Sequence, residues 1–101
     1  TALVGIVRDR ALHVAHAGDS RAYLLRDGDL VPLTEDHSFV AERVRAGDMT
    51  EAEARRSRFR NMVTRAIGID RAVEPDLRRE ILLPGDRCLF CTDGLTTMVP
   101  D

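Results

Sequence analysis

The chain has 101 residues, of which 32% are charged and 44% are hydrophobic, and this composition is typical of one small soluble domain rather than of a disordered or fibrous protein. Its formal net charge of −2 argues against a nucleic-acid partner, which would require a strong basic excess. No apolar run approaches the roughly 20 residues that span a bilayer, so we expect no membrane contact from this segment. The two cysteines make no disulfide framework, and we therefore expect a reducing, cytoplasmic location. Because the chain starts at Thr1 without a methionine, we interpret it as a piece of a longer protein.

The first third of the chain predicts a meander of short strands. Four β-rich runs are separated by turn signals: Ala2–Arg8, Ala11–Ala17, Arg21–Arg26 and Asp29–Thr34. The dipeptide Asp9-Arg10 separates the first two runs. Asp27-Gly28 separates the last two, and this dipeptide readily adopts the positive φ angles of a two-residue hairpin turn.

Histidines and cysteines offer little support for a metal site of their own. In the run 11–17 the period of two places His16 on the face of Leu12 and Val14, and His13 on the opposite face. These two histidines therefore cannot share a metal ion. Cys88 and Cys91 have the spacing of half a zinc site, but no second pair exists, so we favour buried, reduced cysteines.

The middle of the chain predicts two short helices. Ser38 precedes an apolar pattern that Gly47 ends, and Thr50 with Glu53 has the spacing of a capping box at the start of a second helix. Between residues 40 and 71 there are eight arginines against five acidic residues. A solvated helical face is the favoured explanation of this local surplus, and a basic flap beside an anionic substrate is the alternative.

The last third returns to strands. The runs Leu77–Leu83 and Arg87–Thr92 flank a turn at Pro84-Gly85-Asp86. The second run is apolar on both faces, which predicts a central strand that is buried from both sides and that ends at Asp93.

Two aspartates stand at element boundaries and are the candidate functional groups. Asp19 lies in Gly-Asp-Ser-Arg between two strands, and Asp93 lies in Thr-Asp-Gly-Leu after the most hydrophobic one. Either carboxylate taken alone is explained best as a cap or an Asx-turn. A carboxylate at the edge of an apolar core can also hold a cation, and a neighbouring glycine lets a ligand approach.

Four stretches, in this order, carry a family resemblance: residues 17–28 (AGDSRAYLLRDG), 33–38 (LTEDHS), 61–68 (NMVTRAIG) and 83–95 (LPGDRCLFCTDGL). With them the chain resembles the bacterial form of the metal-dependent serine/threonine protein phosphatases of the PP2C (PPM) family. This resemblance implies an α+β fold, part of an αββα sandwich of antiparallel sheets flanked by helices. Residues 1–101 would be the middle portion of the domain, with a flap-like helical insertion at about residues 40–60.

The resemblance also implies the chemistry. Members hydrolyse phosphoserine and phosphothreonine in proteins with a water held by two Mg²⁺ or Mn²⁺ ions, without a phosphoenzyme. Asp93 matches a ligand of this core metal pair, and Asp19 matches a ligand of a third, more weakly bound ion. We therefore expect Asp93 to lie in a cleft near Asp19. His37 receives no chemical role, and a hydrogen-bonded loop histidine is the favoured interpretation.

The chain lacks two further ligand motifs of the family, Asp-Gly-Met-Gly-Gly and Asp-Asn, so it contains no complete catalytic set and should be inactive by itself. Substrate-binding residues are not assigned. The implied partners are phosphoproteins, in opposition to a serine/threonine kinase. The alternatives are a non-catalytic interaction module and a phosphatase that acts on regulators of sigma factors.

Overall fold

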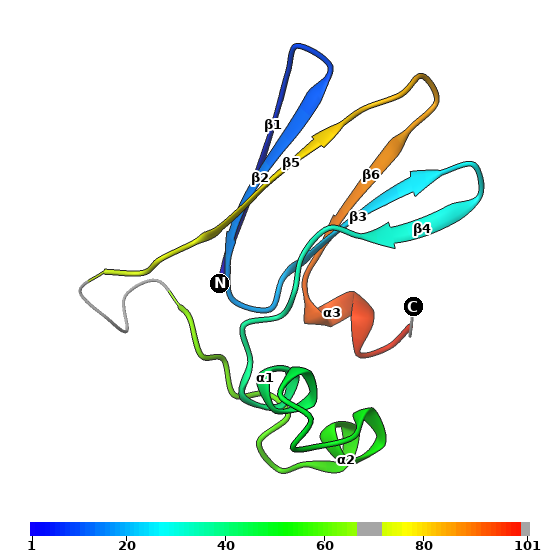
Figure 1. Ribbon diagram of the computed structural model, residues 1–101. Coiled ribbons are helices and arrows are strands. Elements are labelled where there is room, and N and C mark those ends of the chain that lie inside the picture. Colours follow the sequence, from blue (N-terminus) through cyan, green and yellow to red (C-terminus); the bar gives the residue numbers. More distant parts are fainter. Residues whose placement is uncertain (67–71, 100–101) are drawn as a thin grey trace.

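The computed structural model describes residues 1–66 and 72–99. Its elements follow in this order: β1 (Ala2–Arg8), β2 (Ala11–Ala17), β3 (Arg21–Arg26), β4 (Asp29–Pro32), α1 (Phe39–Arg45), α2 (Glu51–Arg56), β5 (Asp76–Ile81), β6 (Arg87–Cys91) and α3 (Asp93–Thr96). The strands form two antiparallel three-stranded sheets with the orders β1-β2-β5 and β4-β3-β6. Figure 1 shows the two sheets above and the helices α1 and α2 beyond their lower ends.

The two predicted hairpins are present. Asp9 and Arg10 have φ angles of 51° and 61°, and Asp27 and Gly28 have φ angles of 52° and 80°. Positive φ at both central residues gives a two-residue turn the twist that the flanking strands require. These turns fix the registers β1 with β2 and β3 with β4.

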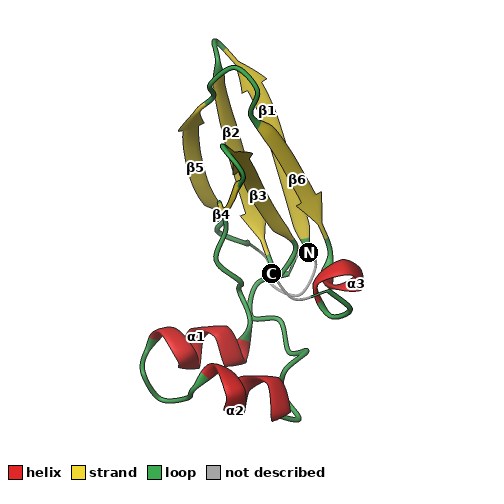
Figure 2. Ribbon diagram, turned by 90° about the vertical axis from the view of Figure 1, so that its right-hand side faces the viewer, coloured by secondary structure: helices red, strands yellow, loops and turns green. Residues whose placement is uncertain are grey.

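The pairings that complete each sheet join segments far apart in the sequence. β5 pairs with β2, and β6 pairs with β3. The sheets meet through a small aliphatic core of Leu12, Val14, Ala22, Leu24 and Leu33, each at most 3% exposed. The α+β sandwich is therefore confirmed, and Figure 2 shows the strands of both sheets with the helices at one end.

The helices begin where the sequence predicts. The Ser38 hydroxyl accepts the N–H of Ala41 at 3.2 Å at the start of α1. At the start of α2 the Thr50 hydroxyl accepts the N–H of Glu53, and the Glu53 carboxylate accepts the N–H of Thr50. Such reciprocal bonds satisfy backbone donors that a helix leaves unpaired at its first turn.

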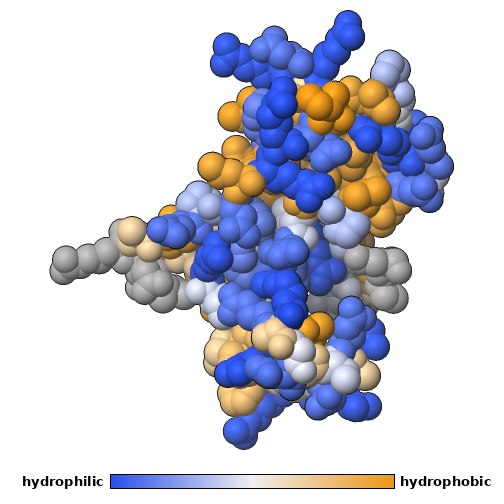
Figure 3. All heavy atoms as spheres, in the orientation of Figure 1, coloured by the Kyte–Doolittle hydropathy of each residue, from blue (hydrophilic) through white to orange (hydrophobic). Residues whose placement is uncertain are grey.

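Two predictions about burial are wrong. β6 is an edge strand of its sheet, and Leu89 and Phe90 are 42% and 38% exposed. Cys88 is exposed and Cys91 half-buried, so the expectation of two buried cysteines also fails. An apolar pattern states what a strand can bury, whereas its burial depends on the segments that cover it. Figure 3 shows hydrophobic residues gathered at the surface over the strands.

In the described part of the chain, no helix combines the length and the apolar character needed to cross a membrane. Ile67 and Gly68 of the third motif lie outside the described residues.

Candidate metal centre

The ends of three strands bring the two candidate aspartates to the same end of the sandwich. β3 and β6 are antiparallel neighbours, with Arg21 opposite Cys91. Asp19 stands two residues before Arg21, and Asp93 stands two residues after Cys91. Both therefore leave the sheet at one end, where Figure 1 shows the β2–β3 turn and α3.

The turn that carries Asp19 is tightly held. Gly18 has a φ of 117°, a conformation that favours glycine, and a side chain there would clash with Thr1. Asp19 is half-buried, and its Oδ1 accepts the Thr1 hydroxyl at 3.2 Å. The next residue, Ser20, is buried. The backbone of this turn therefore decides where the Asp19 carboxylate lies.

Asp93 opens α3, a helix of one turn. The Thr92 hydroxyl caps it by accepting the N–H of Gly94 at 3.3 Å. The Asp93 side chain is exposed, and it makes no hydrogen bond or ion pair with any residue of the described ranges 1–66 and 72–99. The expectation that Asp93 lies in a cleft is therefore not met, since its side chain is exposed among the described residues.

The donor chemistry at this end of the sheet fits a hard divalent cation. Asp19 and Asp93 offer carboxylate oxygens, the ligands that Mg²⁺ and Mn²⁺ prefer. The Asp93 carboxylate has no competing partner in the described part of the chain, and Asp19 has a single weak one. Two carboxylates can contribute to such a site but do not complete one.

A second cluster, formed by His16, His37 and Asp76, had no counterpart among the sequence predictions. Their potential ligand atoms all lie within 4.8 Å of one another. The imidazole rings of His16 and His37 are stacked, with centroids 4.4 Å apart and planes 9° apart. Both histidines are buried, at 5% and 1% exposure, whereas the Asp76 side chain is 47% exposed.

Hydrogen bonds assign this cluster to a network rather than to a metal. His37 Nδ1 accepts the N–H of Gly18 at 3.0 Å, so the proton of the neutral ring is on Nε2. That Nε2 lies 2.7 Å from Asp76 Oδ2 and donates to it. His16 Nε2 lies 2.9 Å from the Glu35 carbonyl and donates likewise. His37 is left without a lone pair for a cation.

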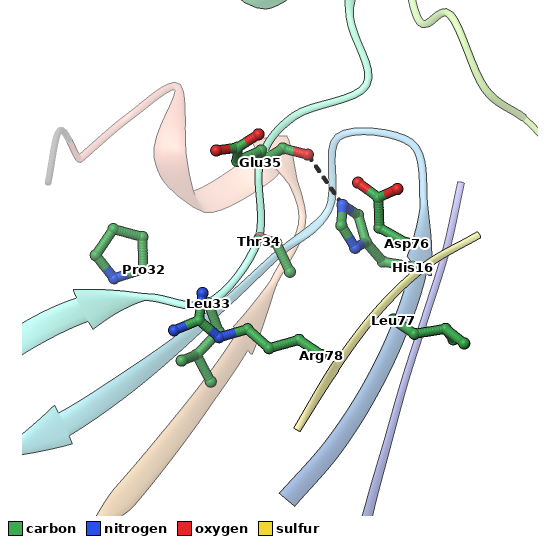
Figure 4. A pocket seen from close by; sticks show the side chains of 8 residues that line it. All are labelled: His16, Pro32, Leu33, Thr34, Glu35, Asp76, Leu77 and Arg78. Carbon is green, nitrogen blue, oxygen red and sulfur yellow. Dashed lines mark hydrogen bonds between the residues drawn. The ribbon is translucent and has the colours of Figure 1, made fainter. Parts of the chain in front are cut away.

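The charge of Asp76 is stabilised by the same contacts. The hydrogen bond from His37 lowers the pKa of the Asp76 carboxyl, and a hydrogen bond from Arg65 adds to the effect against the opposing influence of desolvation. Arg65 Nη1 lies 2.9 Å from Asp76 Oδ1. Figure 4 shows His16 and Asp76 side by side at a cavity of about 430 Å³ between β5 and the segment that follows β4. Asp19 and Asp93 do not line this cavity.

Another ion pair fixes the segment that leads to His37. The guanidinium of Arg21 donates two hydrogen bonds to the Asp36 carboxylate, at 2.9 and 2.8 Å. These bonds raise the pKa of Arg21 above its ordinary value. Arg45 also donates to the Asp36 carbonyl at 2.9 Å. The start of β3 and the residue before His37 are thereby tied together.

The helical insertion leaves and rejoins the sandwich through a short stem. The N–H of Phe39 donates to the Met62 carbonyl at 2.9 Å, and the N–H of Thr64 donates to the His37 carbonyl at 2.8 Å. Within the insertion Arg43 pairs with Asp48, whereas Arg55 is exposed and pairs with no described residue. The flap at residues 40–60 stays a prediction, as does its basic face.

The sequence therefore predicted the two aspartates at one end but not the histidine cluster. His37 is the hydrogen-bonded histidine that was expected, and His13 and His16 do lie on opposite faces, one exposed and one buried. The one sequence feature that could have indicated the cluster was His16. A histidine on the apolar face of a strand needs a polar partner when buried, and this requirement pointed to a second polar group nearby.

Comparisons with known proteins find similar sequences and similar structures. The sequence model of the family described as protein phosphatase 2C matches residues 1–101. The serine/threonine phosphatase stp of Listeria welshimeri is 39% identical over 101 residues, which are all of this chain and 40% of the relative. The S. agalactiae serine/threonine phosphatase has a TM-score of 0.93 at 40% identity, over 97% of this chain and 40% of that one.

A further solved structure carries metal. The catalytic domain of the serine/threonine protein phosphatase PstP, in complex with two manganese ions, matches with a TM-score of 0.84 at 38% identity. The match covers 98% of this chain and 40% of that chain. The chain thus spans about 40% of the length of the relatives that it matches.

Proposed function

Because this chain belongs to the protein phosphatase 2C family, we propose that it is part of a larger domain that hydrolyses phosphoserine and phosphothreonine in proteins. We use the term complete domain for the whole phosphatase domain of which these 101 residues are proposed to be a part. The apolar faces of the strands support a partial domain, since many of their side chains are exposed: Val4, Ile6, Leu77, Ile81, Leu89 and Phe90. The relatives named as serine/threonine phosphatases support the activity.

One observation carries the proposal. The register of β3 and β6 pairs Arg21 with Cys91, so Asp19 and Asp93 both leave the sheet at the same end although they are far apart in the sequence. Oxygen donors gathered in this way suit hard divalent cations. The comparisons do not favour a non-catalytic interaction module or a phosphatase of sigma-factor regulators.

The two aspartates receive different roles in this proposal. Asp93 is a ligand of the core metal pair, and Asp19 is a ligand of a third, more weakly bound ion, with Mg²⁺ or Mn²⁺ as the metal. When bound, such ions supply Lewis acidity that activates water and stabilises charge on the transferred phosphoryl group. This chain's part is to hold its two carboxylates toward that site. Lacking further ligands, the isolated chain should be inactive.

Substrates and setting follow from the same reasoning. We propose phosphoproteins as substrates, a serine/threonine kinase as the opposing enzyme and the cytoplasm as the location. Residues 40–60 would form a flap beside the substrate. The exposed arginines of the insertion, Arg55 among them, suit an anionic phosphopeptide.

The test of Asp93 uses the variant Asp93→Asn in the complete domain. Loss of a ligand charge with little change of shape should lower Mn²⁺-dependent hydrolysis of p-nitrophenyl phosphate at least about a hundredfold. Asp29→Asn is the matched control, because Asp29 is an exposed aspartate on β4 without a partner among the described residues. Near-normal activity of Asp93→Asn would refute the assignment.

Asp19→Ala tests the division of roles. This variant should lower turnover and remove the weakest Mn²⁺-binding event in calorimetry, while tighter binding remains. If all Mn²⁺ binding disappears with Asp19→Ala, Asp19 is a core ligand and the division is wrong.

A further inference from the structure

His37 lies between the candidate metal centre and β5. The proposed function assigns no role to this residue. It is 1% exposed, and both of its ring nitrogens are engaged. A buried histidine that is fully hydrogen-bonded holds the groups that it contacts in place. For His37 these groups are the backbone of Gly18 and the side chain of Asp76.

His37 satisfies both backbone groups of Gly18. The N–H of Gly18 donates to His37 Nδ1 at 3.0 Å, and the N–H of His37 donates to the Gly18 carbonyl at 2.9 Å. Gly18 immediately precedes Asp19 in the β2–β3 turn. The side chain of Asp19 itself has only the Thr1 hydroxyl as a partner in the described part of the chain. The direction of its carboxylate therefore depends on the turn that His37 holds.

The imidazole of His37 is itself fixed on its other side. Asp76 accepts from Nε2 at 2.7 Å, and this bond selects the tautomer in which Nδ1 can accept from Gly18. The ring of His16 stacks on that of His37 and is held in turn by the Glu35 carbonyl. Rotation of the His37 ring would break both of its hydrogen bonds and this stacking.

We propose that His37 is a positioning residue for Asp19, oriented by Asp76, and that the chain Asp76–His37–Gly18 sets the affinity of the complete domain for the divalent cation to which Asp19 contributes. This inference rests on the proposed function. It assigns no contact between His37 and the cation, and His37 acts only through the backbone of the turn. Partners bonded directly to a metal ligand usually change metal affinity about 10–100-fold when they are removed, and a partner that acts through the neighbouring backbone should lie at about the lower end of this range.

Two substitutions of His37 separate its two hydrogen bonds. In His37→Asn the amide oxygen stands near the former Nδ1 and can still accept from Gly18, while the bond to Asp76 is lost. In His37→Gln the amide nitrogen stands near the former Nε2 and can still donate to Asp76, while the acceptor for Gly18 is lost. Both variants remove the ring and so impose similar packing defects.

The measurement is Mn²⁺ binding to the complete domain by calorimetry, with urea unfolding of each metal-free variant beside it. His37→Gln should weaken the weakest Mn²⁺ site about tenfold, and His37→Asn should weaken it less than about threefold. A purely structural role predicts instead that Mn²⁺ affinity follows stability, with the two variants alike. Equal affinities of the two variants would overturn the proposal.

A second pair of variants keeps the buried ring and serves if either His37 variant fails to fold. Asp76→Ala removes the acceptor that orients His37, at a side chain that is 47% exposed. Arg65→Gln removes the other partner of the same carboxylate and leaves the His37 bond in place. Asp76→Ala should weaken Mn²⁺ binding severalfold and Arg65→Gln should not, and equal effects would overturn the proposal.

Asp19→Ala distinguishes this inference from the proposed function. If Asp19→Ala leaves Mn²⁺ binding unchanged, the metal role of Asp19 is wrong and the positioning role falls with it. If Asp19→Ala removes a weak site while His37→Gln leaves that site intact, the proposed function stands and only the positioning role is refuted.

Discussion

Gly18→Ala in the complete domain tests whether the turn that carries Asp19 depends on glycine. The φ of 117° at Gly18 lies outside the left-handed helical region, and residues other than glycine held in such regions are strained by about 1–3 kcal/mol. The new Cβ would also clash with Thr1 Oγ1 and come within 3.0 Å of Thr1 Cα. Movement of Thr1 would remove its hydrogen bond to Asp19, worth about 1 kcal/mol.

These effects together amount to about 3 kcal/mol. Gly28→Ala is the matched control, because Gly28 also has a positive φ, of 80°, but a Cβ there would meet nothing within 4 Å. Its strain alone should amount to about 1–2 kcal/mol. The entropy that alanine removes from the unfolded chain is common to both variants and cancels in the comparison.

The assay is urea unfolding of the two variants and the parent domain in the presence of a chelator. The chelator is needed because metal binding to the folded state would add its own stabilisation. Gly18→Ala should be less stable than Gly28→Ala by about 1–2 kcal/mol. If the two variants unfold at the same urea concentration with the same slope, the contact with Thr1 does not restrain the turn.

Two further substitutions probe how the sheets are joined. Gly5→Ala should lower the free energy of unfolding by about 1–3 kcal/mol, because the added methyl group would meet the Phe90 ring, with Cε2 at 2.6 Å. The double variant with Phe90→Leu should be more stable than the sum of the single effects, and strict additivity would contradict this contact. Asp86→Asn should destabilise the domain at neutral pH, because Arg26 and the N–H of Leu83 lower the pKa of the Asp86 carboxyl. The ionised form stabilises the fold above pH 3.8, the ordinary pKa, and this contribution is lost as pH falls through the lower folded pKa. The difference in urea midpoint between the parent domain and the variant should therefore shrink in acid, and a constant difference would contradict the pairing.

Local signals predicted the hairpins and helices, because each depends on neighbouring residues. Asp27-Gly28 adopts the turn that its residue types favour, and Thr50 caps α2 through a bond to Glu53. No local sequence feature indicated that β6 is an edge strand. Its apolar residues are consistent with a central or an edge strand, and pairing with β3 is decided by segments more than 60 residues apart.

Of the candidate site, only the two aspartates that follow or precede strands were predicted from the sequence. The resemblance named Asp19 and Asp93 as candidate ligands, and the β3–β6 register brings both residues to one end of the sheet. The cluster of His16, His37 and Asp76 could not be predicted from spacing, because its members come from β2, a loop and β5. Only their burial and hydrogen bonds, which are properties of the folded chain, bring them together.

The position of His37 explains how the helical insertion can coexist with a fixed Asp19 turn. The chain leaves the sandwich after His37 and returns at Thr64, whose N–H donates to the His37 carbonyl. His37 also binds Gly18 and Asp76, so the stem is attached to β2 and β5 before the helices begin. Movements of α2 would therefore leave the Asp19 turn in place, whereas α1 is tied to the stem by the bond from Arg45 to the Asp36 carbonyl. In the complete domain, a deletion of residues 48–58 that preserves the stem should accordingly change KM for a phosphopeptide more than it changes Mn²⁺ affinity. An equal loss of both would show that the stem does not isolate the turn.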